Sequence, residues 1–174
     1  MKITEVKINI LLLIVALAAT IYSFFAQYYL GFEPCPLCIV QRLDVILIAL
    51  FSVLALISHR CLIATKLLLF INLIASGFGV WVSYHHYWLT TLPADQIPLA
   101  CGMPMAHMFK IMPLDGFLAK VLSGDAECAT VTFKIFGLSA PLVTCGLFVL
   151  FGILAFIGLF AKRQKKWKER GTFL

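Results

Sequence analysis

Charged residues are scarce in this sequence. Asp, Glu, Lys and Arg make up only 13% of the 174 residues, whereas hydrophobic residues make up 62%. A water-soluble domain has about 25% charged residues, so this composition excludes an ordinary soluble fold. Much of the chain must therefore face lipid.

Four stretches are long and apolar enough to cross a bilayer, for which about 20 residues are needed. They run over about Ile8–Leu30, Leu43–Ser58, Leu67–Leu89 and Pro141–Ala161. The first is too long for a typical secretory signal, and three spans follow it, so we expect it to be retained. We predict an all-α integral membrane protein, a four-transmembrane-helix bundle in which residues 1–174 form a single membrane domain. Its outer loops would cover about 31–42 and 90–140.

Basic residues are distributed unevenly between the two sides of this bundle. One side has ten of the 14 Lys and Arg residues: Lys2, Lys7, Arg60, Lys66, Lys162, Arg163, Lys165, Lys166, Lys168 and Arg170. The positive-inside rule therefore places both termini in the cytoplasm. The basic tail after residue 161 is expected to be a topological anchor, with binding of anionic lipid as the alternative. The net charge of +6 comes mainly from this asymmetry, so it does not indicate a nucleic-acid partner.

The predicted topology sorts the six cysteines. Cys61 lies at a cytoplasmic link, and Cys145 lies in the fourth span, where it is expected to be a packing residue. The other four lie outside: Cys35, Cys38, Cys101 and Cys128. An even number of exported cysteines suggests disulfides.

Cys35 and Cys38 are separated by two residues, Pro36 and Leu37. Pro36 suits the first position of a helix, which would place Cys38 in the first turn, where the helix dipole stabilises a thiolate. Arg42, four residues further on, would lie on the same face and add a positive charge. A static disulfide closed over so short a loop would stabilise the fold little. The pattern therefore favours redox activity.

Two metal-site readings are disfavoured. The four outer cysteines could in principle hold zinc, but only one pair has the two-residue spacing typical of such sites. His85 and His86 are adjacent on a helix and point about 100° apart, so they cannot easily ligate one ion together. We expect no metal site, and we interpret both histidines as membrane-interface residues, with contact of one of them to a bound cofactor as the alternative.

A short amphipathic helix is predicted within the second outer loop. Apolar residues recur at helical spacing between Pro113 and Gly124: Leu114, Phe117, Leu118, Val121 and Leu122. The segment is too short to span a bilayer, so it would lie in the interface with its apolar stripe in the lipid. The alternative is a helix packed on the bundle.

Taken together, these features resemble the DsbB family of bacterial disulfide bond formation proteins over nearly the whole chain. The resemblance rests on Cys35 and Cys38 followed by Arg42, and on a second loop containing Cys101 and Cys128. The segments Pro113-Leu114-Asp115, Ser123-Gly124-Asp125 and Phe136-Gly137-Leu138-Ser139-Ala140-Pro141 also look like the family. Between Cys101 and Cys128 the loop is one residue longer than the family pattern.

The resemblance implies a thiol–quinone oxidoreductase of the bacterial inner membrane. In this family a disulfide corresponding to Cys101–Cys128 oxidises a periplasmic DsbA-like, thioredoxin-fold dithiol oxidase, and the mixed disulfide forms through Cys101. Electrons then pass to Cys35–Cys38, and from Cys38 to ubiquinone or menaquinone next to Arg42. A quinone dissolves in the bilayer, which explains why such an enzyme is embedded there.

Two other functions remain as alternatives. A specialised relative would oxidise one dedicated partner, whereas a non-enzymatic protein would be a disulfide-stapled membrane scaffold. The role of Arg42 is also open at this point. A charge at the membrane boundary is costly without a function, so we expect Arg42 to assist quinone reduction and not to serve fold stability. The alternative is an interfacial anchor.

Overall fold

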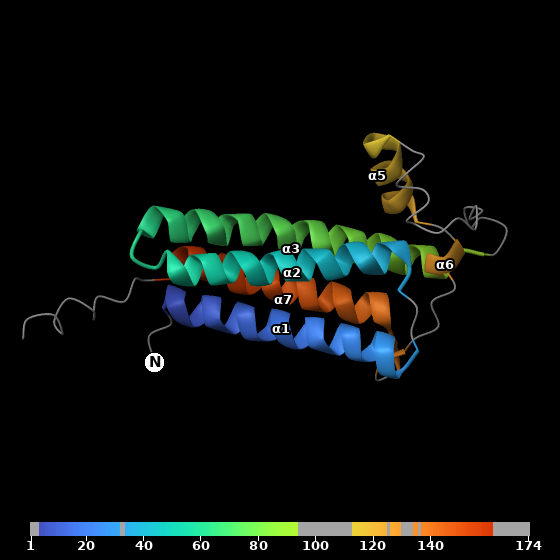
Figure 1. Ribbon diagram of the computed structural model, residues 1–174, viewed down its shortest axis with the longest axis horizontal. Helices are drawn as coiled ribbons and strands as arrows, with labels where there is room; N and C mark the ends of the chain where they lie inside the picture. The colour runs from blue at the N-terminus through green and yellow to red at the C-terminus, as the bar shows by residue number, and fades with distance from the viewer. Residues whose placement is uncertain are drawn as a thin grey trace, which may run out of the picture.

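The computed structural model describes residues 4–31, 34–93, 113–124, 126–129, 134–135 and 137–161. Four long helices lie side by side in an elongated bundle: α1 (Glu5–Tyr29), α2 (Pro36–Ile57), α3 (Leu62–Thr91) and α7 (Ala140–Phe160) (Figure 1). Each is long and apolar enough to cross a membrane. This confirms the four-span prediction. The second span begins at Pro36 and not near Leu43, because the polar residues of its first two turns bond to neighbouring helices. Gln41 contacts His86 of α3, and Arg42 bonds to Ser23 of α1.

Apolar residues fill much of the bundle core and also cover its outer surface. Its core takes buried residues from every long helix: Leu12, Ile48, Leu69, Phe148 and Phe151. Large apolar residues also point outward along the bundle, such as Ile14 and Phe160, which are 58% and 74% exposed. Because a membrane-spanning helix satisfies its backbone polar groups internally, these outward faces are suited to lipid.

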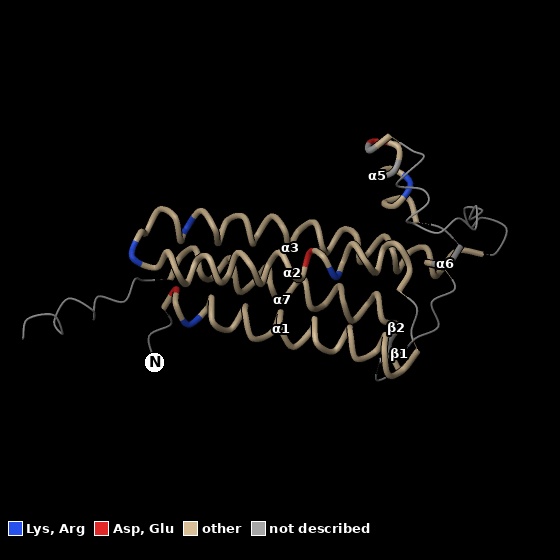
Figure 2. The backbone as a smooth tube through the Cα atoms, in the orientation of Figure 1, with Lys and Arg blue, Asp and Glu red and all other residues tan. Residues whose placement is uncertain are grey.

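An ion pair fastens the end of the bundle where α1 and α3 begin and α7 finishes. Lys66 Nζ lies 2.8 Å from Glu5 Oε1. The same ammonium donates to the carbonyl oxygens of Gly158 and Ala161 at 3.1 and 3.2 Å, at the C-terminal end of α7. Basic residues lie along the backbone at this end, as Figure 2 shows. It is the end that the positive-inside rule predicts to be cytoplasmic; the basic tail lies outside the described residues.

The opposite end, called the cysteine end, is formed by the last turns of α1 and α3 and the first turns of α2 and α7. Four short elements lie here: α5 (Leu114–Ser123), α6 (Ala126–Ala129), β1 (Lys134–Ile135) and β2 (Leu138–Ser139) (Figure 1). The two strands pair antiparallel, with Lys134 opposite Ser139. They lead directly into α7.

Helix α5 matches the predicted amphipathic helix, since it begins after Pro113 and ends at Gly124. Gly124 has a φ of 72°, which favours glycine. A Cβ there would overlap the Leu89 side chain and lie 3.1 Å from that of Leu37. The backbone after α5 is therefore pressed against α2 and α3. The apolar stripe of α5 is divided, because Val121 is buried while Leu118 is 49% exposed.

Candidate functional site

The first turn of α2 positions two thiols. Cys35 is the N-cap residue, and its sulfur accepts a hydrogen bond from the Cys38 backbone N–H at 3.4 Å. Pro36 follows it at the start of the helix, as predicted. The Cys35 thiol also donates to the Cys38 sulfur, with 3.0 Å between the two sulfurs. Both cysteines are free thiols, so this is the reduced form of the Cys-x-x-Cys pair.

The third thiol comes from α6. Cys128 is fully buried and packs with Cys35 in a small cluster of buried residues at the cysteine end. A hydrogen bond with Cys128, a hydrogen bond with Cys38 and burial raise the pKa of the Cys35 thiol above its ordinary value. Cys35 therefore contacts both Cys38, its partner in the first outer loop, and Cys128 of the second outer loop. Cys101 lies outside the described residues.

His86 joins this thiol cluster from α3. Its Nε2 lies 3.7 Å from Cys35 Sγ and 3.2 Å from the Cys128 carbonyl oxygen. On the other side of the ring, the Gln41 amide nitrogen lies 3.4 Å from Nδ1. These contacts fit a neutral ring that accepts from Gln41 and donates through Nε2. A single side chain thus connects α2, α3 and α6.

The interpretation of both histidines as interface residues is wrong for His86, which is only 1% exposed. His85 is partly exposed and stacks between Trp81 and Trp88, and its interpretation as an interface residue stays a prediction. The spacing of Gly79, Ser83 and His86 could have revealed the difference. They recur at i, i+4 and i+7 on one face of α3, and small or polar residues on one face of a membrane helix indicate an inward face.

The same cluster is the part of the described structure closest to a metal-binding arrangement. The ligand atoms of Cys35, His86 and Cys128 lie within 4.8 Å of one another. In the present arrangement, however, the Cys35 thiol bonds to Cys38 and His86 contacts a carbonyl oxygen. We assign these groups to thiol chemistry, and the absence of a metal site stays a prediction.

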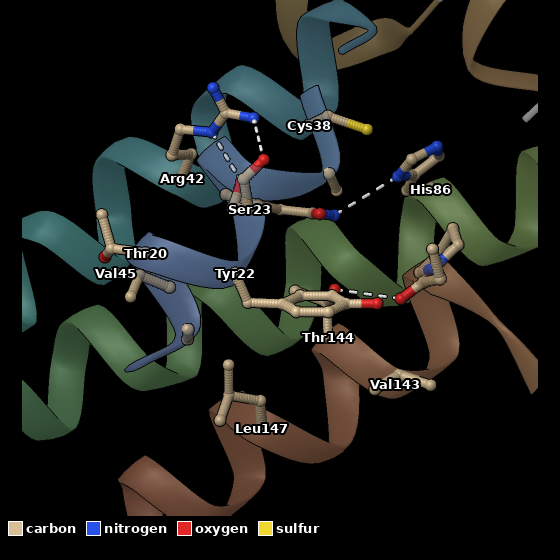
Figure 3. Close-up of a pocket in the computed structure, with 15 residues that line it drawn as sticks. Thr20, Tyr22, Ser23, Cys38, Arg42, Val45, His86, Val143, Thr144 and Leu147 are labelled. Atoms are coloured by element: carbon tan, nitrogen blue, oxygen red, sulfur yellow. Dashed lines mark hydrogen bonds between the residues drawn. The ribbon is translucent and has the colours of Figure 1, made fainter. Parts of the chain in front are cut away.

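A cavity of about 380 Å³ opens beside Cys38, between α1, α2 and α7. Its wall is mostly apolar, with residues such as Val45, Val143 and Leu147, and the polar groups Cys38, Gln41, Arg42 and His86 also line it (Figure 3). The predicted shared face of Cys38 and Arg42 is thereby confirmed, because both side chains border the same cavity. Pockets for small organic ligands typically combine apolar walls with a few placed polar groups and begin at about 300 Å³.

The Arg42 guanidinium is fixed by α1. Its Nε donates to Ser23 Oγ at 2.7 Å and its NH1 to Gln27 Oε1 at 2.6 Å, and a longer bond of 3.3 Å reaches the Ser23 carbonyl. The Phe24 ring lies 4.7 Å from the guanidinium carbon. These bonds tie α2 to α1, which argues against the expectation that Arg42 does not serve fold stability; its part in quinone reduction stays a prediction. Arg42 forms no ion pair with Asp44 in the described part of the chain.

Comparisons with known proteins identify relatives that match most of the chain. The family described as "Disulfide bond formation protein DsbB" matches residues 5–158. A disulfide bond formation protein B from Psychrobacter sp. (strain PRwf-1) is 34% identical over 161 residues, which are 90% of this chain and 94% of the relative. The Saccharophagus degradans protein of the same name is 37% identical over 139 residues, 80% of this chain and 78% of the relative. This multi-pass membrane protein belongs to the DsbB family, whose members act in disulfide bond formation.

Proposed function

We propose that this protein is a thiol–quinone oxidoreductase of the bacterial inner membrane. It would reoxidise a periplasmic DsbA-like dithiol oxidase and pass the electrons to ubiquinone or menaquinone. The observation that carries this proposal is the position of the Cys-x-x-Cys pair. Cys35 meets Cys128 on one side, while Cys38 borders the cavity on the other.

The first stage would take place on the second loop. The partner's thiolate attacks Cys101 of a Cys101–Cys128 disulfide, and Cys128 leaves as a thiolate. Family membership supports this assignment. The closeness of Cys128 to the first-loop pair supports the direction in which the electrons then move.

The second stage would be a thiol–disulfide exchange inside the cluster. Starting from a Cys35–Cys38 disulfide, the Cys128 thiolate attacks the Cys35 sulfur and forms a Cys35–Cys128 bond. The electron pair of the broken bond stays on Cys38, which becomes a thiolate beside the cavity. The partner's second thiolate then displaces Cys101 and the partner leaves as a disulfide; the freed Cys101 thiolate attacks Cys128, which re-forms the Cys101–Cys128 disulfide and leaves Cys35 to become a thiol. His86 holds the geometry, because it contacts both Cys35 and the Cys128 carbonyl.

The residues around the cavity fit a quinone ring. When bound there, a quinone supplies an acceptor for two electrons and two protons. Arg42 would place a permanent charge near the oxygens that become negative during reduction. Its three hydrogen bonds to α1 keep the guanidinium in place, so little reorganisation is needed. Gln41 and His86 offer further polar contacts at the wall.

Both termini are proposed to be cytoplasmic, with the cysteine end facing the periplasm. The ion-paired end of the bundle carries Lys66, and the basic asymmetry of the sequence favours this end as the inner one. The thiols would then meet their partner in an oxidising compartment.

The direct test is anaerobic mixing of the purified protein with a reduced DsbA-like protein and a short-chain ubiquinone. We expect stoichiometric quinol and partner disulfide. A Cys38→Ser variant, which removes the sulfur at the cavity, should form no quinol. Quinol formation by Cys38→Ser at the wild-type rate, or none by the wild-type protein, would refute the proposed function.

A further inference from the structure

Asp44 is a buried acid that the proposed electron path does not use. It lies in α2, two residues after Arg42, and is only 4% exposed. No hydrogen bond or ion pair to Asp44 is found among the described residues, and its Oδ2 is fully buried without a partner. A carboxylate in the interior of a membrane protein is costly unless it is paired, and such residues often belong to proton relays.

The packing around Asp44 is arranged to admit its carboxyl group. Gly79 of α3 faces it so closely that a Cβ at this position would lie 2.6 Å from Asp44 Oδ2 and would overlap the Phe148 ring. The absence of a side chain at Gly79 therefore lets the carboxyl group approach α3 within the bundle. Asp44 is thus directed inward between the helices and away from the lipid.

Two contacts give the register of α2 against α3. Gln41 meets His86, and Asp44 meets the position of Gly79. Ser83 lies on the same face of α3, between these two contact points. Its hydroxyl is fully buried and has no hydrogen-bond partner among the described residues. A hydroxyl can accept and donate a proton, so Ser83 is suited to connect Asp44 with His86, which lines the cavity.

We propose that Asp44 is a proton reservoir for quinone reduction, acting through Ser83 and His86. This inference rests on the proposed function. In the reduced enzyme Cys35 is a thiol, Cys38 is a thiolate, and Asp44 is a neutral acid that holds the second proton of the partner dithiol. The proton is kept inside the protein because the neutral acid is the form that a buried, unpaired carboxyl group tolerates.

The oxidation step then balances. Cys35 and Cys38 lose two electrons and form their S–S bond. The quinone gains these two electrons together with one proton from the Cys35 thiol and one from Asp44, giving quinol and an Asp44 carboxylate. The net charge is −1 before and after the step. When the next partner dithiol reduces the Cys35–Cys38 disulfide through the second-loop cysteines, one of its two protons is taken up by Cys35 and the other by Asp44, while Cys38 stays a thiolate.

Other titratable or charged groups could contribute to a pH profile. Cys38 and Arg42 of α2, His86 of α3 and Tyr22 of α1 line the cavity, and Cys145 lies on α7. The test therefore compares variants at Asp44 itself. Asp44→Asn keeps the shape of the side chain but cannot release a proton, and Asp44→Glu restores the acid. Ser52→Ala is the matched control, because Ser52 is a buried polar residue of α2 that does not line the cavity.

The first measurement needs no quinone. Infrared spectra of the reduced, quinone-free protein at neutral pH should contain a protonated-carboxyl C=O band that shifts in D₂O and is missing in Asp44→Asn. The band should remain in Ser52→Ala. Identical carboxyl bands in the wild type and Asp44→Asn would mean that Asp44 is ionised, and the inference would be overturned.

The second measurement follows quinol formation from the pre-reduced enzyme and a short-chain ubiquinone. Asp44→Asn should be slower by roughly 100-fold at pH 8, at the lower end of what a general acid contributes. It should recover towards pH 6, where protons from bulk water can replace the reservoir. Asp44→Glu should restore much of the rate, and thiol exchange with the partner should not change in any variant. A pH-independent defect that Glu does not relieve would show a merely structural role.

The two hypotheses can fail separately. If the wild-type protein forms no quinol, the proposed function is wrong. If the wild type forms quinol and Asp44→Asn follows the same rate and pH profile, only the role of Asp44 is wrong.

Discussion

Replacement of Arg42 separates its two contributions, to helix packing and to the cavity. Arg42→Met removes the three hydrogen bonds to Ser23 and Gln27 together with the charge. Arg42→Lys keeps the charge but loses the planar fork that reaches both partners at once. The two variants should therefore differ in stability and in quinone kinetics.

The size of the stability effect follows from the contacts. Hydrogen bonds between membrane helices contribute about 0.6 kcal/mol each on average, so loss of all three should cost about 2 kcal/mol. The lysine variant, which can keep one bond, should lose about 1 kcal/mol. For quinone, loss of one charge-assisted hydrogen bond of about 1.5 kcal/mol would raise the KM of Arg42→Met by about 10-fold. Lys should raise it less.

Unfolding of quinone-free protein in mixed micelles measures the first effect, and steady-state quinol formation measures the second. Gln27→Ala is a suitable control, because it removes one acceptor of Arg42 but does not line the cavity. It should lose about 0.6 kcal/mol of stability and keep the wild-type KM for quinone. Wild-type quinone kinetics in both Arg42 variants would reduce this residue to a helix-packing role and refute the electrostatic argument.

Three further predictions concern the cysteines and α3. In Cys128→Ser the Cys101–Cys128 disulfide cannot form, so oxidation of the reduced partner should stop, seen by thiol alkylation as a partner that stays reduced; partner oxidation at the wild-type rate would refute the proposed first stage. Cys61 is exposed, and a membrane-impermeant thiol reagent should label it in inverted vesicles but not in intact spheroplasts, while the buried Cys128 should react slowly in both. Gly79→Ala should destabilise the bundle by about 1–3 kcal/mol through overpacking, since the new methyl group would overlap the Phe148 ring; an unchanged unfolding midpoint in mixed micelles would contradict the tight α2–α3 contact.

Features that depend on neighbouring residues could be predicted without the structure. Runs of apolar residues determine where helices can span lipid, and the four spans were found at nearly the predicted positions. Pro113 and Gly124 bracket α5 because proline suits the start of a helix and a positive φ at its end favours glycine. The helix start at Pro36 and the shared face of Cys38 and Arg42 follow from the same local geometry.

Contacts between distant segments could not be predicted in this way. Cys128 reaches Cys35 because Gly124 allows the chain after α5 to lie against α2 and α3, and no sequence spacing records that approach. His86 looks like its neighbour His85 in the sequence, yet a rotation of about 100° along α3 places one among the thiols and the other among exposed tryptophans.

The same division applies to the charged residues of α2. The sequence establishes that Arg42 and Asp44 lie near a membrane boundary and point to different sides of a helix. Only the packed bundle determines their surroundings: Arg42 meets Ser23 and Gln27 of α1, and Asp44 enters the space left by Gly79 of α3. Helical periodicity is a property of one segment, whereas the partner of each face depends on how four helices pack against one another.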